Sequence, residues 1–280
     1  MSIAMASGAT GHKTILVLLG TGTPVVDPNH SGPCTAVVVG GEAYLFDAGP
    51  GVVRRAAEAY RNGIAALNPI NLRHVFFTHL HSDHTAGYPD LILTPWPVGR
   101  RLPLEAYGPK GLKSMTEHIQ MAYKEDHDVR IHGLESLDPM GAVVNVHEIE
   151  AGTVYKDENV TIQAFPVKHG SWIHAFGYRI QGPDRVIVLS GDTAPTQAVV
   201  DACNGCDILV HEVHSGAGPY MGTFHTSIPE LAEIANKAKP KLLVLYHQLY
   251  LGRASDRDLV DEIHKLYSGV VVSGQDLDVF

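Results

Sequence analysis

Three histidines and one aspartate fall within six positions of a single segment, VFFTHLHSDHTAG at residues 75–87, directly after a β-branched and aromatic run. In an extended segment, side chains two residues apart project the same way, so His79 and His81 can aim at one point. Asp83 and His84 follow where the chain turns, and they can face a neighbouring point. Imidazole nitrogens with one carboxylate are ligands that suit zinc. The full HxHxDH pattern at a strand end therefore favours a metal site over a set of surface histidines.

The same arrangement recurs three times later in the chain. AFPVKHG ends an apolar run at His169, VIVLSGDT ends one at Asp192, and LLVLYHQ ends one at His247. Strand ends hold side chains on a common rim, because the rigid elements fix their positions. Six positions cannot complete the ligand shells of two metal ions, so we expect these three residues to supply further ligands.

Short β-branched or aromatic runs recur along the chain and predict strands at 15–19, 36–39, 44–46, 75–78, 143–146, 160–165, 186–190, 208–210 and 242–246. Helical patterns lie between them at 52–67, 111–124, after the capping box of Ser227 and Glu230, and at 256–267. Because strands come in consecutive hairpins as well as between helices, a mixed α/β layered fold is favoured over a doubly wound parallel sheet.

Composition limits the class of protein. With 280 residues, of which 45% are apolar, the chain can bury a substantial core, and we expect one domain at 13–280 after a loose or tag-like tail at 1–12. The net charge of −9 argues against a broadly basic, nucleic-acid-binding surface. No apolar run approaches the ~20 residues that span a bilayer. Three cysteines favour a reducing, cytoplasmic setting, with the CxxC of Cys203 and Cys206 structural or incidental.

The motifs LGTGTP, YLFDAGPG, THLHSDHTAG, VKHG, SGDT and LYHQ together resemble the metallo-β-lactamase superfamily, and within it the ribonuclease Z and arylsulfatase-like branch. The resemblance covers the chain from Ile15 to about Gly252, and it implies a four-layer αββα sandwich with a two-zinc site along one edge. It also implies the ligands: one zinc is bound by His79, His81 and His169, the second by Asp83, His84 and His247, and Asp192 bridges both. Histidine at position 81 is similar to the zinc hydrolases of the family rather than to its di-iron members, so zinc is preferred over manganese or iron.

Two cations ~3.5–4 Å apart can share a water, lower its pKa and polarise the bond under attack, so we expect hydrolysis by a bridging hydroxide. Asp83, whose second oxygen can reach that water, is the candidate for orienting or deprotonating it. LVHEVHS and FHTS are similar to ribonuclease Z motifs in which a glutamate orients a histidine. On that resemblance Glu212 orients His225, which acts as general acid or oxyanion stabiliser. The alternative is that His225 merely precedes a helix and Glu212 contacts only solvent.

Three further residues are candidates for substrate binding. Trp172 and His174 share the loop after His169, where they are expected to line a substrate wall, and Trp96 is expected to join them. Ordinary packing is the alternative for all three. The segment EDHDVRIH at 125–132 is expected to be a solvated loop or part of a lid.

Differences between this sequence and ribonuclease Z indicate which substrate to expect. That enzyme carries a long arm that grips transfer RNA, inserted between the ligands that match His169 and Asp192. Here only the 22 residues 170–191 separate them, and we expect a hairpin turning at Gly182 and Pro183 to fill this interval. The basic loop expected after LGTGTP is also missing, and phosphate contacts normally dominate the affinity for RNA.

We therefore expect a dinuclear zinc hydrolase that cleaves an ester of a small molecule: a phosphodiester, a sulfate ester, or a carboxylic ester or lactone. Processing of the 3′ end of transfer RNA is the alternative, with RNA the lesser candidate partner. A metal-binding regulatory or scaffold protein without turnover is the alternative from another class. No membrane partner is expected, and the resemblance allows a homodimer.

Overall fold

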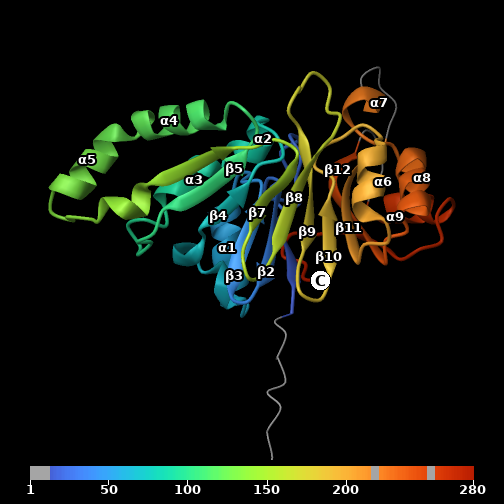
Figure 1. Ribbon diagram of the computed structural model, residues 1–280, viewed down its shortest axis with the longest axis horizontal. Helices are drawn as coiled ribbons and strands as arrows, with labels where there is room; N and C mark the ends of the chain where they lie inside the picture. The colour runs from blue at the N-terminus through green and yellow to red at the C-terminus, as the bar shows by residue number, and fades with distance from the viewer. Residues whose placement is uncertain (1–12, 216–220, 251–255) are drawn as a thin grey trace, which may run out of the picture.

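The computed structural model describes residues 13–215, 221–250 and 256–280, and the tail predicted at 1–12 lies outside them. Two β-sheets pack face to face in the middle of the molecule, with helices on both outer sides (Figure 1).

The first sheet has six strands in sequence order. Its first three strands form an antiparallel meander, and the following strands pair in parallel. The strands are β1 (Ile15–Gly20), β2 (Cys34–Val39), β3 (Glu42–Phe46), β4 (His74–Phe76), β5 (Leu104–Gly108) and β6 (Val144–Glu148). The helices that pack on its outer face are α1 (Val52–Arg61), α3 (Tyr88–Leu93) and α4 (Leu112–Ala122).

The second sheet has seven strands: its first four strands in sequence order form an antiparallel meander of three pairs, and the remaining strands pair in parallel. In spatial order the strands are β13 (Val271–Ser273), β12 (Leu242–Tyr250), β11 (Ile208–Ser215), β10 (Val186–Leu189), β9 (Phe176–Gln181), β8 (Thr161–Pro166) and β7 (Gly152–Lys156). Its outer face is covered by α6 (Gln197–Cys203), α8 (Ile228–Ala238) and α9 (Asp256–His264).

The core is divided into three layers of apolar side chains, and β1 shows how they arise. Leu16 and Leu18 point into the layer between the two sheets, whereas Val17 and Leu19 point into the layer under α1. This alternation is the period of two that a strand buried on both faces must have. A third layer lies between the second sheet and α6, α8 and α9. The predicted αββα fold is confirmed.

Two helical predictions need correction. The helix predicted at 52–67 ends at Arg61, because Gly63 adopts a φ of 102°, and a 3-10 turn, η1 (Ala65–Leu67), follows. The segment 125–132, predicted as a loop or lid, lies in α5 (Lys124–His132). Lys124 pairs with Asp128 one helical turn away, and such i,i+4 pairs support an exposed helix.

The remaining short helices are η2 (Pro69–Asn71), α2 (Ser82–Thr85), η3 (Pro139–Ala142) and α7 (Met221–Phe224). The hairpin predicted around Gly182 and Pro183 is present, since β9 and β10 pair up to Gln181 and Val186. Cys203 and Cys206 form a disulfide, which the sequence-based expectation did not include. No helix among the described residues is long and apolar enough to cross a membrane.

The C-terminal segment 274–280 returns to β1 and fixes the loop that follows this strand. The backbone N–H of Leu16 donates to the carbonyl of Phe280 over 3.1 Å. The carboxylate of Asp276 accepts the backbone N–H groups of Thr21 and Ser31, each over 2.8 Å, and pairs with Arg55 Nε at 3.1 Å. One buried carboxylate therefore holds both ends of the β1–β2 loop.

Candidate metal centre and catalytic site

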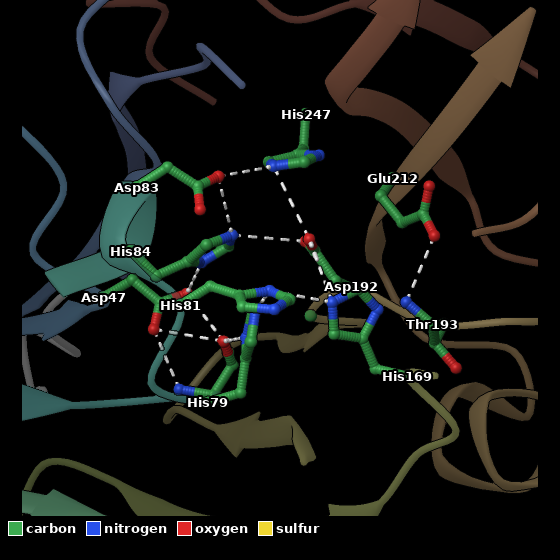
Figure 2. A network of polar contacts seen from close by, with 12 residues as sticks. Asp47, His79, His81, Asp83, His84, His169, Asp192, Thr193, Glu212 and His247 are labelled. Atoms are coloured by element: carbon green, nitrogen blue, oxygen red, sulfur yellow. Dashed lines mark hydrogen bonds and ion pairs between the residues drawn. The ribbon is translucent and has the colours of Figure 1, made fainter. Parts of the chain in front are cut away.

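The seven predicted ligands come together at one edge of the two sheets (Figure 2). Six of the seven lie in the turn, loop or short helix that follows a strand, and one lies inside a strand. The elements are the turn after β4 with α2 for His79, His81, Asp83 and His84, the loop after β8 for His169, the turn after β10 for Asp192, and β12 for His247.

His79, His81 and His169 form the first group of potential ligands. His81 Nδ1 lies 2.9 Å from His79 Nε2 and 3.0 Å from His169 Nε2. Nitrogens that bind one tetrahedral cation at 2.0–2.1 Å are about 3.3 Å apart, so the three atoms have nearly the spacing of a single ligand shell.

Asp83, His84 and His247 form the second group, and Asp192 faces both groups. Asp83 Oδ2 lies 3.2 Å from His247 Nε2 and 3.5 Å from His84 Nε2. Asp192 places Oδ1 3.4 Å from His84 Nε2, and Oδ2 3.5 Å from His247 Nε2 and 3.9 Å from His169 Nε2. Asp192 therefore occupies the position between the two groups, where a bridging ligand would lie.

Outer hydrogen bonds orient the imidazoles of the first group. His169 Nδ1–H donates to the carbonyl of Phe224 over 2.8 Å, and His79 Nδ1–H donates to Thr78 Oγ1 over 3.0 Å. Burial lowers the pKa of both histidines, which keeps the rings neutral. A neutral imidazole carries one N–H and one lone pair, so the Nε2 atoms of both rings present lone pairs to the site. Such partners commonly orient metal-binding histidines.

His84 is oriented in the same way by Asp47. His84 Nδ1–H donates to Asp47 Oδ2 over 2.8 Å, so its Nε2 faces Asp83 and Asp192. His84 Nε2 and Asp192 Oδ1 are buried and make no hydrogen bond among the described residues. Burial opposes a charge on His84, but Asp192 and Asp47 outweigh it and raise its pKa well above the usual range, so these converging atoms require positive charge between them, from a proton or from a metal cation. The donor set therefore fits a metal centre, and metal binding belongs to this site.

The carboxylates of the site are held in their ionised form. Burial opposes the charge of Asp192, but His247 and His84 outweigh it, and the pKa of Asp192 lies well below its usual range. For Asp83, burial is likewise outweighed, here by the hydrogen bond from His247 and by His84, and the pKa is lowered. Negative charge is thus present where the second cation would bind.

Asp47 is a functional residue that the sequence reasoning missed. It follows β3, adopts a φ of 63°, and accepts the backbone N–H of Thr78 over 2.8 Å as well as His84 Nδ1–H. Aspartate tolerates this left-handed conformation better than most residues. The signal was available, because YLFD places an acidic residue directly after a strand, as the predicted ligands are placed.

His247 reaches the site through an irregularity in β12. The strand does not end at this residue, as LLVLYHQ suggested, but continues to Tyr250. Glu212 pairs with Tyr246 and Val213 pairs with Gln248, so His247 is the extra residue of a β-bulge, with a φ of 45°. A bulge turns one side chain out of the regular alternation, and here it directs the imidazole to Asp83.

Glu212 and His225 stand beside the metal-type ligands. Glu212 lies in β11, is fully buried, and uses Oε1 to accept His225 Nδ1–H over 3.2 Å and the backbone N–H groups of Thr193 and Thr226 over 3.1 Å each. The ring of His225 lies 5.2 Å from that of His169, measured between centroids. The alternative in which Glu212 contacts only solvent is therefore wrong, whereas the catalytic role of the pair stays a prediction.

The three predicted substrate residues have different positions. Trp96 is fully buried and donates its indole N–H to the carbonyl of Asp138 over 2.8 Å, so its predicted place in a substrate wall is wrong. Trp172 is half-buried and its Nε1 lies 2.7 Å from His81 Nε2. It lines a pocket of about 540 Å³ beside the ligands, together with Lys168. His174 is half-buried in the same loop, and its role stays a prediction.

Comparisons with known proteins agree with this architecture. A family model described as "Beta-lactamase superfamily domain" matches residues 42–248. A protein of Mycobacterium bovis (strain BCG / Pasteur 1173P2) named Ribonuclease Z is 33% identical over a 276-residue alignment, which covers 94% of this chain and 96% of that protein. The metallo-beta-lactamase fold protein YhfI from Bacillus subtilis superposes with a TM-score of 0.76 at 18% identity, covering 95% of this chain and 98% of the other. Human tRNase Z, short form, gives 0.70 at 23% identity, with the same coverage of 95% and 98%.

These findings overturn the expected small-molecule ester and the expectation that RNA is the lesser partner. That ranking rested on the missing arm between His169 and Asp192. The M. bovis Ribonuclease Z is covered over 96% of its length by this chain, so it has little extra sequence for such an arm. The missing arm therefore does not separate this chain from the ribonuclease Z enzymes, and the net charge describes the whole surface rather than one groove. The prediction of a metal-dependent hydrolase acting on ester bonds is confirmed, and the chain belongs to the ribonuclease Z family of the β-lactamase superfamily.

Proposed function

We propose that this protein is an endoribonuclease that cleaves precursor transfer RNA at its 3′ end. One observation carries the proposal: a hydrogen-bonded Glu212–His225 pair stands beside the converging ligands, in a chain 33% identical to a Ribonuclease Z over most of its length. The proposal includes the cytoplasmic location expected from the sequence.

We further propose that the centre binds two Zn²⁺ ions. The first group offers three imidazole nitrogens, and the second offers two imidazoles and a carboxylate, with Asp192 between them. This mixture of nitrogen and oxygen ligands suits Zn²⁺, and Mn²⁺ or Fe²⁺ are the alternatives that it would also accept. When bound, a pair of such ions supplies Lewis acidity, which activates water and stabilises charge on the phosphate.

Asp83 is placed to orient the attacking water. Its Oδ2 is the atom that faces His247 and His84, at 3.2 and 3.5 Å, while its side chain keeps 12% of its surface exposed. The other oxygen, Oδ1, is therefore the one available to accept a hydrogen bond from water at the mouth of the site. A carboxylate whose pKa is lowered stays ionised and can act as this acceptor near neutral pH.

His225 is placed to donate a proton to the leaving oxygen. Its Nδ1–H is held by Glu212, so its Nε2 is turned toward His169 and His247, whose ring centroids lie 5.2 and 5.9 Å away. The side chain is 15% exposed, so a substrate can reach it. Glu212 acts through His225: it is a positioning residue that fixes the orientation of the ring.

The test uses precursor transfer RNA that carries a 3′ trailer, together with a bis-aryl phosphodiester as a generic substrate. Metal-loaded wild-type protein should cut the precursor at the trailer junction. His225→Gln should lower kcat by about 10²- to 10⁴-fold, the usual contribution of a general acid, with the metal content per chain unchanged. His118→Gln, on the exposed face of α4, is the matched control and should leave kcat unchanged. Protein that carries two metal ions per chain and hydrolyses the aryl diester, yet leaves the precursor intact, would refute the proposal.

A further inference from the structure

Trp172 presents an aromatic side chain beside the first group of potential ligands. Its ring meets those of His79 and His81 at 75° and 84°, with centroid distances of 6.0 and 5.2 Å. Among the described residues, no aromatic ring stacks parallel on the indole, and the side chain is only half-buried. Since aromatic rings prefer edge-to-face or offset-stacked partners, the indole is free to stack on a flat ligand ring.

The loop between β8 and β9, which carries Trp172, is held on both sides. On one side it lies beside α7 (Figure 1), where the backbone N–H of Gly170 donates to the carbonyl of Thr223 over 2.9 Å. On the other side the backbone N–H of Ala194 donates to the carbonyl of Lys168 over 2.6 Å. The position of the loop is therefore fixed before a ligand binds, which lowers the entropy lost on binding.

The indole is part of the wall of a pocket of about 540 Å³ next to the ligands. Ala194 and Pro195 add apolar surface to this pocket, and the ligand His169 also lines it. Pockets of roughly 300–1,000 Å³ with a mostly apolar lining are typical of sites for small organic ligands. The pocket therefore has the size for a ring-bearing group that continues from the metal centre.

The charged groups of the pocket favour a neutral ligand over an anion. Lys168 supplies an ammonium group and Glu230 a carboxylate, so the lining carries one charge of each sign. The carboxylate is fixed in place, because its Oε2 accepts the backbone N–H and the hydroxyl of Ser227. A nucleobase fits this setting, since its face can stack on an indole and its edge carries both hydrogen-bond donors and acceptors.

The pocket lies on the side of the centre where His225 stands. Gly222 and Thr223 of α7 line it, and His225 follows them closely in the chain. The ring of His169, which also lines the pocket, lies 5.2 Å from that of His225, measured between centroids. His225 is the proposed proton donor to the leaving oxygen, so the nucleotide that carries this oxygen is the one whose base can reach the pocket.

We propose that Trp172 stacks on the base of the nucleotide that carries the leaving oxygen, and thereby helps to select the bond that is cut. Hydrolysis breaks the bond between phosphorus and this oxygen, water supplies the new oxygen on phosphorus, and the leaving oxygen takes a proton. The nucleotide is therefore recognisable in the products, because it ends in a newly formed hydroxyl. The inference rests on the proposed function, since it takes RNA as the substrate and His225 as the proton donor.

The first experiment changes the side chain and measures KM for precursor transfer RNA with metal-loaded protein. Loss of one base–aromatic stack weakens binding by about 5- to 150-fold, so Trp172→Leu should raise KM by a factor in this range. Trp172→Phe keeps an aromatic face and should stay within about 3-fold of wild type. Ile173→Ala, in the same loop and 89% exposed, is the matched control and should leave KM unchanged. Equal KM values for wild type and Trp172→Leu would overturn the proposal.

The second experiment removes the base instead of the indole. A precursor with an abasic nucleotide at the position that carries the leaving oxygen should bind wild type about 5- to 150-fold more weakly, whereas Trp172→Leu should show no comparable further loss. An abasic nucleotide on the other side of the cleaved bond is the control, and its effect should add to that of Trp172→Leu. Additive effects at the first position would refute the stacking contact.

The third experiment does not depend on RNA cleavage. The chain has only two tryptophans and Trp96 is fully buried, so a ligand that stacks on an indole and quenches its fluorescence reports Trp172. Adenosine 3′- or 5′-monophosphate should quench Zn²⁺-loaded wild type saturably, whereas ribose 5-phosphate should not, and Trp172→Leu should lose the effect. Wild type that neither nucleotide quenches would contradict the proposal. Quenching in a protein that leaves precursor transfer RNA intact would refute the proposed function alone.

Discussion

Two substitutions of Glu212 can distinguish its contribution to stability from its proposed contribution to catalysis. Its Oε1 accepts three hydrogen bonds, from the backbone N–H groups of Thr193 and Thr226 and from His225 Nδ1. Its Oε2 is buried and has no hydrogen-bond partner among the described residues. Glu212→Gln keeps an oxygen at the position of Oε1, whereas Glu212→Ala removes all three acceptor contacts.

The expected destabilisation follows from the number of donors left unpaired. In Glu212→Ala two backbone N–H groups, on the fully buried Thr193 and Thr226, lose their acceptor. Each unsatisfied buried donor costs about 1–3 kcal/mol, so the free energy of unfolding should fall by about 2–6 kcal/mol. Glu212→Gln places an amide group at the site of the unpartnered Oε2 and should cost about 1–2 kcal/mol. Burial, followed by repulsion from Asp192, already raises the pKa of Glu212 well above its usual value, so the neutral amide is a close substitute.

The assay is urea unfolding of both variants at equal metal content, followed by kcat on precursor transfer RNA for the folded proteins. Glu212→Ala should unfold at a clearly lower urea concentration than Glu212→Gln. The amide still accepts His225 Nδ1–H, so Glu212→Gln should keep kcat within about 10-fold of wild type, while Glu212→Ala should lose about 10²-fold or more. Equal midpoints for the two variants would show that the three contacts at Oε1 do not carry the stability assigned to them.

Three further predictions concern other carboxylates. Asp192→Asn should reduce the metal content below two ions per chain, measured by mass spectrometry of the desalted protein, because Asp192 faces both groups; two retained ions would contradict this. Asp276→Ala should lower the free energy of unfolding by about 2–4 kcal/mol in urea, since Thr21 and other donors of the β1–β2 loop lose a charged acceptor; no change would exclude the anchor. Burial opposes the charge of Asp157, but hydrogen bonds from Tyr44 and from the backbone outweigh it and lower its pKa. Its stabilisation is therefore present above the unfolded pKa and lost as pH falls through the folded one, so Asp157→Asn should show a smaller loss of stability between pH 7 and pH 3; identical pH profiles would contradict this.

The residues of the centre were predictable wherever a polar side chain directly follows a strand-like run. His79, His169 and Asp192 obey that rule, and so does Asp47, which was overlooked because its role is to hold His84 rather than to contact a metal. His247 was found although its local structure was misread. Sequence alone does not show a β-bulge, because the extra residue becomes visible only in the register with β11.

Other features depended on tertiary context that no local pattern carries. Tryptophan is a residue type that often lines pockets, which is why Trp96 was predicted to do so. In the structure its indole N–H donates to the carbonyl of Asp138, 42 positions away, inside the core. The helix α5 has only two apolar residues, Val129 and Ile131, so hydrophobic periodicity gave no helical signal, although Lys124 and Asp128 form an i,i+4 pair along it. The substrate class was mistaken for a related reason: a missing arm was treated as a missing partner, although a Ribonuclease Z with little extra sequence for such an arm matches almost the whole chain.

The segment Phe224–Thr226 links the metal ligands to the proposed acid. The carbonyl of Phe224 accepts His169 Nδ1–H, His225 donates to Glu212, and the backbone N–H of Thr226 donates to the same carboxylate oxygen. Three consecutive residues thus fix the tautomer of a first-group ligand, the position of the acid and the position of the residue that orients the acid. Since these contacts share one backbone segment, a displacement of that segment moves the proton donor and the ligand together. The distance between the proposed acid and the ligand group is therefore set by this one backbone segment together with the hydrogen bonds that tie it to His169 and to Glu212.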